Sequence, residues 1–494
     1  MGISVSLPLA IELGVIVILT PILLAYHTRR QKEMRLARHA FWNDFVANRY
    51  YVHFAVYAFI VFFKELIDGL NEPIKSSTGD YTRWIHAIEG NLVYWIQTPL
   101  ENFWLSKVLS FHYLFIYVFF FYYSAVYYLY SQDRDMLDKS VLAYLTVYVL
   151  AVPFYLFFNV EVTSSYIPAM KALLYNDSAL YWEFLLSHDP LDNSVPSLHI
   201  SMLLTFIFIN ILHTREKGIA IEQWRHRGFH LFILTNLMIY SFSILYLGIH
   251  WVTDILFGAL VAGVAALFVH YTQPVLRAWA DSAIEFRPPP RIAQNLLAQS
   301  IIIIALLALI LGSVHFQSIS EVKYPTMIHG PQDTKMEVLQ PIEEGEMINI
   351  TVTNLHENLT AEGVLVELTA GSFAMENGTI NWTKLSLQYP VIYFSPNSTT
   401  NLTITQAETW FVLIIHHPEE IQVESEDADL ATSEVLWLPI HIEVEYPQQE
   451  ILQAVLLCMP ALMIAAYVMH RVTMMRLAGI PLHESRFLQH LESE

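Results

Sequence analysis

Two short stretches of this chain hold the residue types that phosphoryl transfer needs. Ser197 and His199 end the sequence Asn-Ser-Val-Pro-Ser-Leu-His, and His250 and Asp254 follow about fifty residues later. Both stretches adjoin long apolar segments, so each places a histidine where a membrane helix would meet water. Ionisable groups at such places are costly and therefore indicate a functional site. We interpret the set as a site for phosphoryl transfer on a lipid.

The two histidines could divide this chemistry between a nucleophile and a proton donor. His250 and Asp254 are four residues apart, which places them on one face of a helix. A carboxylate there holds an imidazole in one tautomer and stabilises its charged form. His250 could then attack phosphorus, while His199 protonates the departing oxygen.

The first stretch also predicts the start of a helix that could bind phosphate. Asn193 and Ser194 are good N-cap residues and proline suits the first helical position, so we expect a helix to begin at Pro196. Its free N–H groups and positive dipole end suit a phosphate, and Ser197 would add a hydroxyl donor. Each of these residues alone more often has a structural role, such as capping. Their combination on two predicted helices favours a catalytic site.

The composition is that of a multi-span membrane protein. The 494 residues are 54% hydrophobic and only 15% charged, whereas soluble proteins carry about 25% charged residues. The single cysteine, Cys458, excludes an intrachain disulfide. A net charge of −20 without a long basic run argues against a nucleic-acid partner. A span needs about 20 apolar residues, and we predict nine, near 4–25, 51–67, 108–130, 139–158, 196–213, 229–248, 250–271, 296–314 and 450–470.

Basic residues predict the orientation of these spans. Arginine and lysine gather at 26–50, after 213, after 271 and in the C-terminal tail. Nine spans place all four regions on one side, which the positive-inside rule makes cytoplasmic. The N-terminus is then outside, the C-terminus is cytoplasmic, and the histidines lie at the extracytoplasmic face of the plasma membrane.

The distribution of asparagine agrees with this orientation. Six of the seven asparagines in 315–448 stand in Asn-x-Ser/Thr sequences, and only Asn176 does so elsewhere. We therefore expect a glycosylated exterior, although a threonine-rich β domain could also produce such sequences by composition. The six are Asn349, Asn358, Asn377, Asn381, Asn397 and Asn401.

Residues 315–448 are predicted to form a separate β-sandwich. Alternating polar and apolar residues at 363–368 and 440–445 have the period of half-buried strands. The segment holds 20 acidic and three basic residues, so it supplies −17 of the net charge. We divide the chain into a first helix and basic interfacial segment (1–50), a six-helix core (51–271), a loop and eighth span (272–314), the β domain (315–448), and a last span with its tail (449–494).

The two motifs resemble the second and third motifs of the type 2 phosphatidic acid phosphatase superfamily. Asn-Ser-Val-Pro-Ser-Leu-His and Leu-Tyr-Leu-Gly-Ile-His-Trp-Val-Thr-Asp are more similar to its inositol phosphorylceramide synthase-like branch, and the resemblance covers about 51–271. It implies that His250 forms a phosphohistidine oriented by Asp254. It also implies that His199 is the general acid, that Ser197 contacts phosphate, and that no metal or cofactor takes part.

Two cations that are usual in this family are missing. The first motif, Lys-x6-Arg-Pro, does not occur, and Ile244 stands where the third motif usually has an arginine. The synthase-like branch also lacks this arginine. We expect Lys171, in the predicted outer loop after the fourth span, to bind phosphate instead, with Arg83 as the second candidate. Each could equally be an ordinary exposed cation.

The sequence thus predicts a membrane enzyme that acts on a phosphorylated lipid. It would hydrolyse the substrate or transfer the phospho-group to an alcohol or sugar alcohol, because one phosphohistidine serves both reactions. The intact His199, His250 and Asp254 favour an enzyme. The missing cations favour the alternative, a non-catalytic membrane anchor that displays the β domain. A transporter is less favoured, because no paired interrupted helices occur.

Overall fold

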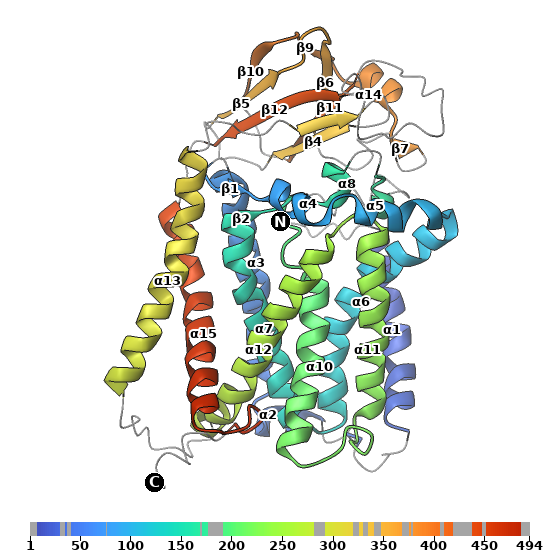
Figure 1. The fold of residues 1–494 in the computed structure, drawn as a ribbon. Coiled ribbons are helices and arrows are strands. Elements are labelled where there is room, and N and C mark those ends of the chain that lie inside the picture. Colours follow the sequence, from blue (N-terminus) through green and yellow to red (C-terminus); the bar gives the residue numbers. More distant parts are fainter. Residues whose placement is uncertain are drawn as a thin grey trace.

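A bundle of long helices carries a β domain at one end (Figure 1). A computed structural model describes residues 7–29, 35–36, 41–75, 77–167, 170–175, 191–280, 292–319, 326–329, 334–339, 347–367, 375–376, 379–405, 410–417, 437–446 and 451–485. The long helices are α1 (Leu7–His27), α3 (Tyr51–Lys75), α6 (Phe103–Tyr130), α7 (Arg134–Phe157), α10 (Leu198–Glu216), α11 (Arg227–Tyr246), α12 (Val252–Ala280), α13 (Ile292–Ile319) and α15 (Ile451–Leu477).

Seven of the helices in the described chain are long and apolar enough to cross a membrane, namely α6, α7, α10, α11, α12, α13 and α15. They coincide with seven of the nine predicted segments. The other two predictions, near 4–25 and 51–67, fall in α1 and α3. In α1 the described side chains run from Gly14 to His27, an apolar stretch shorter than a full span. Helix α3 carries Lys64, Glu65 and Asp68.

Two of the long helices, α6 and α7, begin at a residue whose side chain caps the helix. The side chain of Asn102 accepts hydrogen bonds from the amides of Trp104 and Leu105 at the start of α6. Asp133 accepts one from Met136 at the start of α7. Each cap satisfies amides that have no partner within the helix. Side by side, α10 packs against α12 and α11, while α7 packs against α3, α12 and α15.

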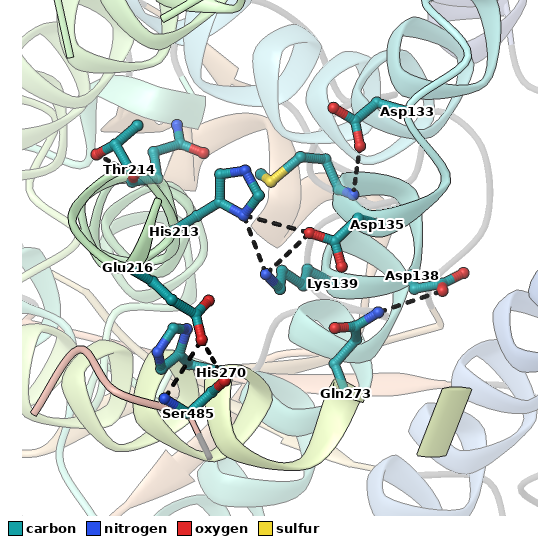
Figure 2. Close-up of polar contacts among 12 residues, drawn as sticks. Asp133, Asp135, Asp138, Lys139, His213, Thr214, Glu216, His270, Gln273 and Ser485 are labelled. Atoms are coloured by element: carbon teal, nitrogen blue, oxygen red, sulfur yellow. Dashed lines mark hydrogen bonds and ion pairs between the residues drawn. The ribbon is translucent and has the colours of Figure 1, made fainter. Parts of the chain in front are cut away.

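The end of the bundle farthest from the β domain is held by paired polar groups (Figures 1 and 2). The Lys139 ammonium lies 3.2 Å from a carboxylate oxygen of Asp135 and 3.1 Å from Nδ1 of His213. The amide of Ser485 donates to the carboxylate of Glu216 across 3.3 Å. These contacts join α7, α10 and the segment after α15. The titratable side chains that make them are therefore hydrogen-bonded or ion-paired within the protein.

A layer of short elements lies between the bundle and the β domain (Figure 1). Strands β1 (Gly79–Asp80) and β2 (Phe158–Asn159) pair in parallel. The layer also contains α4 (Thr82–Glu89), α5 (Leu92–Gln97) and α8 (Thr163–Tyr166), and α2 (Phe41–Ala47) lies at the opposite end. Two short 3-10 helices, η3 (Thr98–Leu100) and η4 (Leu173–Tyr175), follow α5 and α8 in the chain.

The β domain contains two four-stranded antiparallel sheets, ordered β10-β5-β12-β3 and β4-β11-β6-β9. Ile350 of β5 pairs with Leu402 on one side and Val444 on the other. Buried residues from both sheets form one hydrophobic cluster. The two segments with predicted strand periodicity lie in or overlap β6 and β12. The elements are β3 (Thr326–His329), β4 (Thr334–Leu339), β5 (Ile348–Asn354), β6 (Ala361–Glu367), β7 (Met375–Glu376), β8 (Thr379–Ile380), α14 (Trp382–Gln388), β9 (Ile392–Phe394), β10 (Ser398–Ile404), β11 (Phe411–His416) and β12 (Trp437–Glu445).

Candidate active site

The two motifs meet at the end of the bundle that faces the β domain. His199 is the second residue of α10, and His250 lies two residues before α12 begins. Because α10 and α12 pack against each other, the two imidazole rings come together with their centroids 6.4 Å apart. The structure therefore brings together the two histidines that the sequence places about fifty residues apart.

The start of α10 differs from the predicted one. The helix begins at Leu198 with Ser197 at the N-cap position, not at Pro196 after Asn193 and Ser194. The amide and the hydroxyl of Ser194 both donate to the carbonyl of Val160, at 3.1 and 3.0 Å. The prediction of the cap was wrong because this segment pairs with another loop before it reaches the helix.

Asp254 holds His250 in a defined orientation. Its Oδ2 lies 2.9 Å from Nδ1 of His250 and accepts the amide of Trp251 across 2.8 Å. Asp254 is fully buried and is the third residue of α12, so its carboxylate also caps the helix start. With Nδ1–H donating to the carboxylate, the lone pair of neutral His250 lies on Nε2. This is the nitrogen that could attack phosphorus.

Glu89, at the end of α4, is part of the site although the sequence analysis did not find it. Its carboxylate accepts the amide of Val252 at 2.9 Å, and it accepts both the amide and the hydroxyl of Thr253. Glu89 therefore binds the first free amides of α12, where a negative charge is favourable. No local signal in the sequence links this glutamate to a helix that begins more than 160 residues later.

Aromatic rings surround the half-buried His199. The ring centroids of Tyr113, Tyr117 and Tyr240 lie 4.1, 4.7 and 5.2 Å from that of His199. Two of these tyrosines come from α6. Aromatic rings thus line the site on the side of His199, whereas His250 is held by its hydrogen bond to Asp254.

Ser197 contributes a buried hydroxyl at the N-cap of α10. Its side chain is fully buried, and its Oγ has no hydrogen-bond partner within the described chain. The same is true of Oδ1 of Asp254. Buried polar atoms normally find a partner, so both atoms depart from the usual pattern, and of the two only the Ser197 hydroxyl can donate a hydrogen bond.

The backbone of Lys171 lies close to Gly248, and its side-chain ammonium is paired with Glu101. Its amide and carbonyl bond the side chain of Gln97, each at 2.8 Å, and a β-carbon on Gly248 would come within 2.7 Å of that carbonyl. The ammonium lies 2.7 Å from a carboxylate oxygen of Glu101, and both side chains are about 40% exposed. Lys171 would have to leave Glu101 to reach a phosphate.

Arg83 lies on α4. Burial raises the pKa of Tyr166, and the positive charge of Arg83 opposes this shift. The ring of Tyr166 is 6.1 Å from that of Trp251, the neighbour of His250. The link between Arg83 and the loop of His250 is therefore indirect and runs through Tyr166.

Comparison with known families adds one finding. Residues 163–278 match the family model of the PAP2 superfamily. The matched range contains both motifs, and it supports the type 2 phosphatidic acid phosphatase superfamily and, in general terms, a phosphatase or phosphotransferase function at a membrane. Neither a curated protein nor a solved structure matches the chain. In the parts of the chain that the structure describes, no group of three or more His, Cys, Asp or Glu side chains could hold a metal ion.

Proposed function

We propose that the chain is a membrane lipid-phosphate phosphatase or phosphotransferase that works through a phosphohistidine on His250. The observation that carries this proposal is the 2.9 Å bond from Nδ1 of His250 to the buried carboxylate of Asp254. This bond leaves Nε2 free to act as a nucleophile. His199, with its ring centroid 6.4 Å away, supplies the second proton-transfer group that the reaction needs.

The reaction has two steps. In the first, Nε2 of His250 attacks phosphorus, the bond from phosphorus to the leaving oxygen breaks, and His199 gives that oxygen its proton. In the second, water or an alcohol attacks the phosphohistidine and gives its proton to His199, and the phosphorus–nitrogen bond breaks. Water yields hydrolysis and an alcohol or sugar alcohol yields transfer, so the acceptor alone decides between the two activities.

Phosphate binding falls to Ser197, with Lys171 and then Arg83 as candidate cations. The unpartnered Oγ of Ser197 lies at the N-cap of α10, where a helix dipole also favours an anion. The amides that begin α12 do not share this role, because Glu89 accepts them.

We also propose that the site faces the exterior of the plasma membrane in a nine-span chain with a glycosylated β-sandwich. Two observations support this arrangement. The candidate site and the β domain lie at the same end of the bundle (Figure 1), and the Asn-x-Ser/Thr sequences gather in the β domain. The two sheets share a hydrophobic cluster, as the layers of a sandwich do. The motif sequences favour the inositol phosphorylceramide synthase-like branch.

A labelling experiment tests the proposal. Purified protein in lipid nanodiscs is incubated with a panel of phosphorus-labelled lipid phosphates, with and without an alcohol acceptor. We expect acid-labile label on the protein, phosphate release in water, and a phosphorylated alcohol when the acceptor is present. His250→Ala should show neither label nor turnover. Label that persists in His250→Ala would assign the nucleophile to another residue.

The second candidate function is a non-catalytic anchor for the β domain. The pairing of Lys171 with Glu101 and the buried Ile244 at the usual arginine position favour it. A wild-type protein that neither acquires label nor releases phosphate from any lipid in the panel would support the anchor and exclude the enzyme.

A further inference from the structure

One short segment, residues 160–164, contacts both motif loops. The carbonyl of Glu161 accepts the indole N–H of Trp251 across 2.8 Å. The carbonyl of Val160 accepts the amide of Ser194, and the amide of Ser164 donates to Gly248 across 2.9 Å. The position of this segment therefore fixes the loop before α10 and the loop that presents His250.

The β domain holds this segment by an ion pair. The ammonium of Lys335, on β4, lies 2.6 Å from a carboxylate oxygen of Glu161, and the two side chains are only 9% and 16% exposed. Burial raises the pKa of Glu161, and the charge of Lys335 opposes this shift. Lys335 thus stabilises the ionised form of the Glu161 carboxylate, which burial disfavours.

Apolar side chains of the β domain also pack with the helix bundle. Val364, Val366, Val412 and Ile414 of sheet β4-β11-β6-β9 belong to the same hydrophobic cluster as the helix bundle. The junction is therefore a packed interface.

We propose that Lys335 is a positioning residue, through which the β domain sets the geometry of the His250 loop. Without Lys335, the buried carboxylate of Glu161 has lost its counter-charge and turns toward water. The backbone of Glu161 moves with it, and the indole of Trp251 loses its acceptor beside His250. The effect on turnover rests on the proposed function, whereas the effect on local structure does not.

The test compares three variants of the full chain in nanodiscs. Lys335→Met removes the ammonium and keeps the length of the side chain. Glu161→Gln combined with Lys335→Met removes both charges of this ion pair, so the side chain at 161 no longer carries an uncompensated charge. Lys384→Met is the matched control, because Lys384 is an exposed lysine on α14 of the same domain. Hydrogen–deuterium exchange and the kinetics of lipid-phosphate turnover are measured on each.

We expect Lys335→Met to increase exchange in peptides covering 158–166 and 246–254. Its kcat should fall on the order of 10- to 100-fold with a much smaller change in KM, because positioning errors reduce the rate rather than binding. The double variant should recover part of both effects, and Lys384→Met should equal the wild type.

Three results would overturn the proposal. The first is that hydrogen–deuterium exchange at 158–166 is unchanged in Lys335→Met. The second is that exchange in this variant increases by a similar amount throughout the helices. The third is that exchange increases locally while the turnover of lipid phosphate is unchanged. If the wild type turns over no lipid phosphate, the proposed function fails, and the exchange measurement still decides whether Lys335 positions the loop.

Discussion

The backbone amide of Ser197 donates to the main-chain carbonyl of Asp254 across 3.4 Å, so the two motifs are joined directly. One turn farther along α12, Gly258 lets the helices approach, because a β-carbon there would come within 3.1 Å of the carbonyl of Ser197. The two motif helices therefore behave as one unit, and a change in either motif also affects the geometry of the other.

Replacing Asp254 by asparagine should reduce turnover without unfolding the protein. The amide keeps the shape of the carboxylate but cannot stabilise a charged imidazole, and it favours the wrong tautomer of His250. We expect kcat to fall by about 10²- to 10⁴-fold. Steady-state kinetics and thermal unfolding are measured together. A variant that retains wild-type kcat would show that Asp254 only caps α12.

Replacing His199 by alanine should affect substrates according to their leaving groups. A poor leaving group needs a proton from the general acid, so its turnover should fall by about 10²- to 10⁴-fold. A good leaving group, such as a nitrophenolate, should be affected much less. A series of aryl and alkyl phosphates measures this dependence. Equal losses across the series would assign His199 to binding or packing rather than to proton transfer.

Glu89→Ala should destabilise the start of α12. The carboxylate accepts two amides and one hydroxyl there, and loss of an N-terminal cap costs about 1 kcal/mol. We expect a lower melting temperature and reduced turnover, with Glu89→Gln between this variant and the wild type because it keeps an acceptor but loses the charge. Glu357→Ala, at an exposed position of the β domain, is the control. Wild-type melting of Glu89→Ala would contradict the capping role.

The sequence predicts the helical core and the pair of motifs well, because both depend on local patterns. Apolar segments give the spans, and the spacing of His250 and Asp254 places them within reach of each other, although His250 itself precedes α12. The resemblance to the phosphatase superfamily agrees with the match over 163–278. The nucleophile, the general acid and the phosphate contact of Ser197 stay predictions.

Long-range contacts were beyond the sequence analysis. Glu89 and Lys335 act on loops far from them in the chain, and an isolated glutamate or lysine in a sequence has no periodic partner that would reveal this. The prediction that a helix starts at Pro196 was wrong for a similar reason. The hydrogen bonds of Ser194 to Val160 outweigh the local preference of Ser194 for capping a helix. The backbone of Lys171 lies beside Gly248, its role in phosphate binding stays a prediction, and its pairing with Glu101 was not foreseen.

Gly248→Ala should be far more damaging than an alanine at another glycine with positive φ. Gly248 has φ +81°, and its β-carbon would lie 2.7 Å from the carbonyl of Lys171 and 2.9 Å from the β-carbon of Ser164. Gly218 has φ +64° with nothing within 4 Å, so Gly218→Ala should cost only about 1–2 kcal/mol for the backbone conformation. Thermal unfolding and turnover of both variants decide this. Equal effects would show that the motif loop can move away from Lys171.

Lys171 and Glu101 provide the final test, since their ion pair competes with phosphate binding. If Lys171 binds phosphate, Lys171→Ala should lower kcat/KM by roughly 10- to 100-fold, as expected for a lost charge-assisted hydrogen bond, and Lys171→Arg should retain part of the activity. Glu101→Gln should lower KM, because it releases the ammonium from its present partner. Kinetics of the three variants on one lipid phosphate are compared. Wild-type values in both Lys171→Ala and Glu101→Gln would identify an ordinary surface ion pair and move the search for the phosphate cation to Arg83.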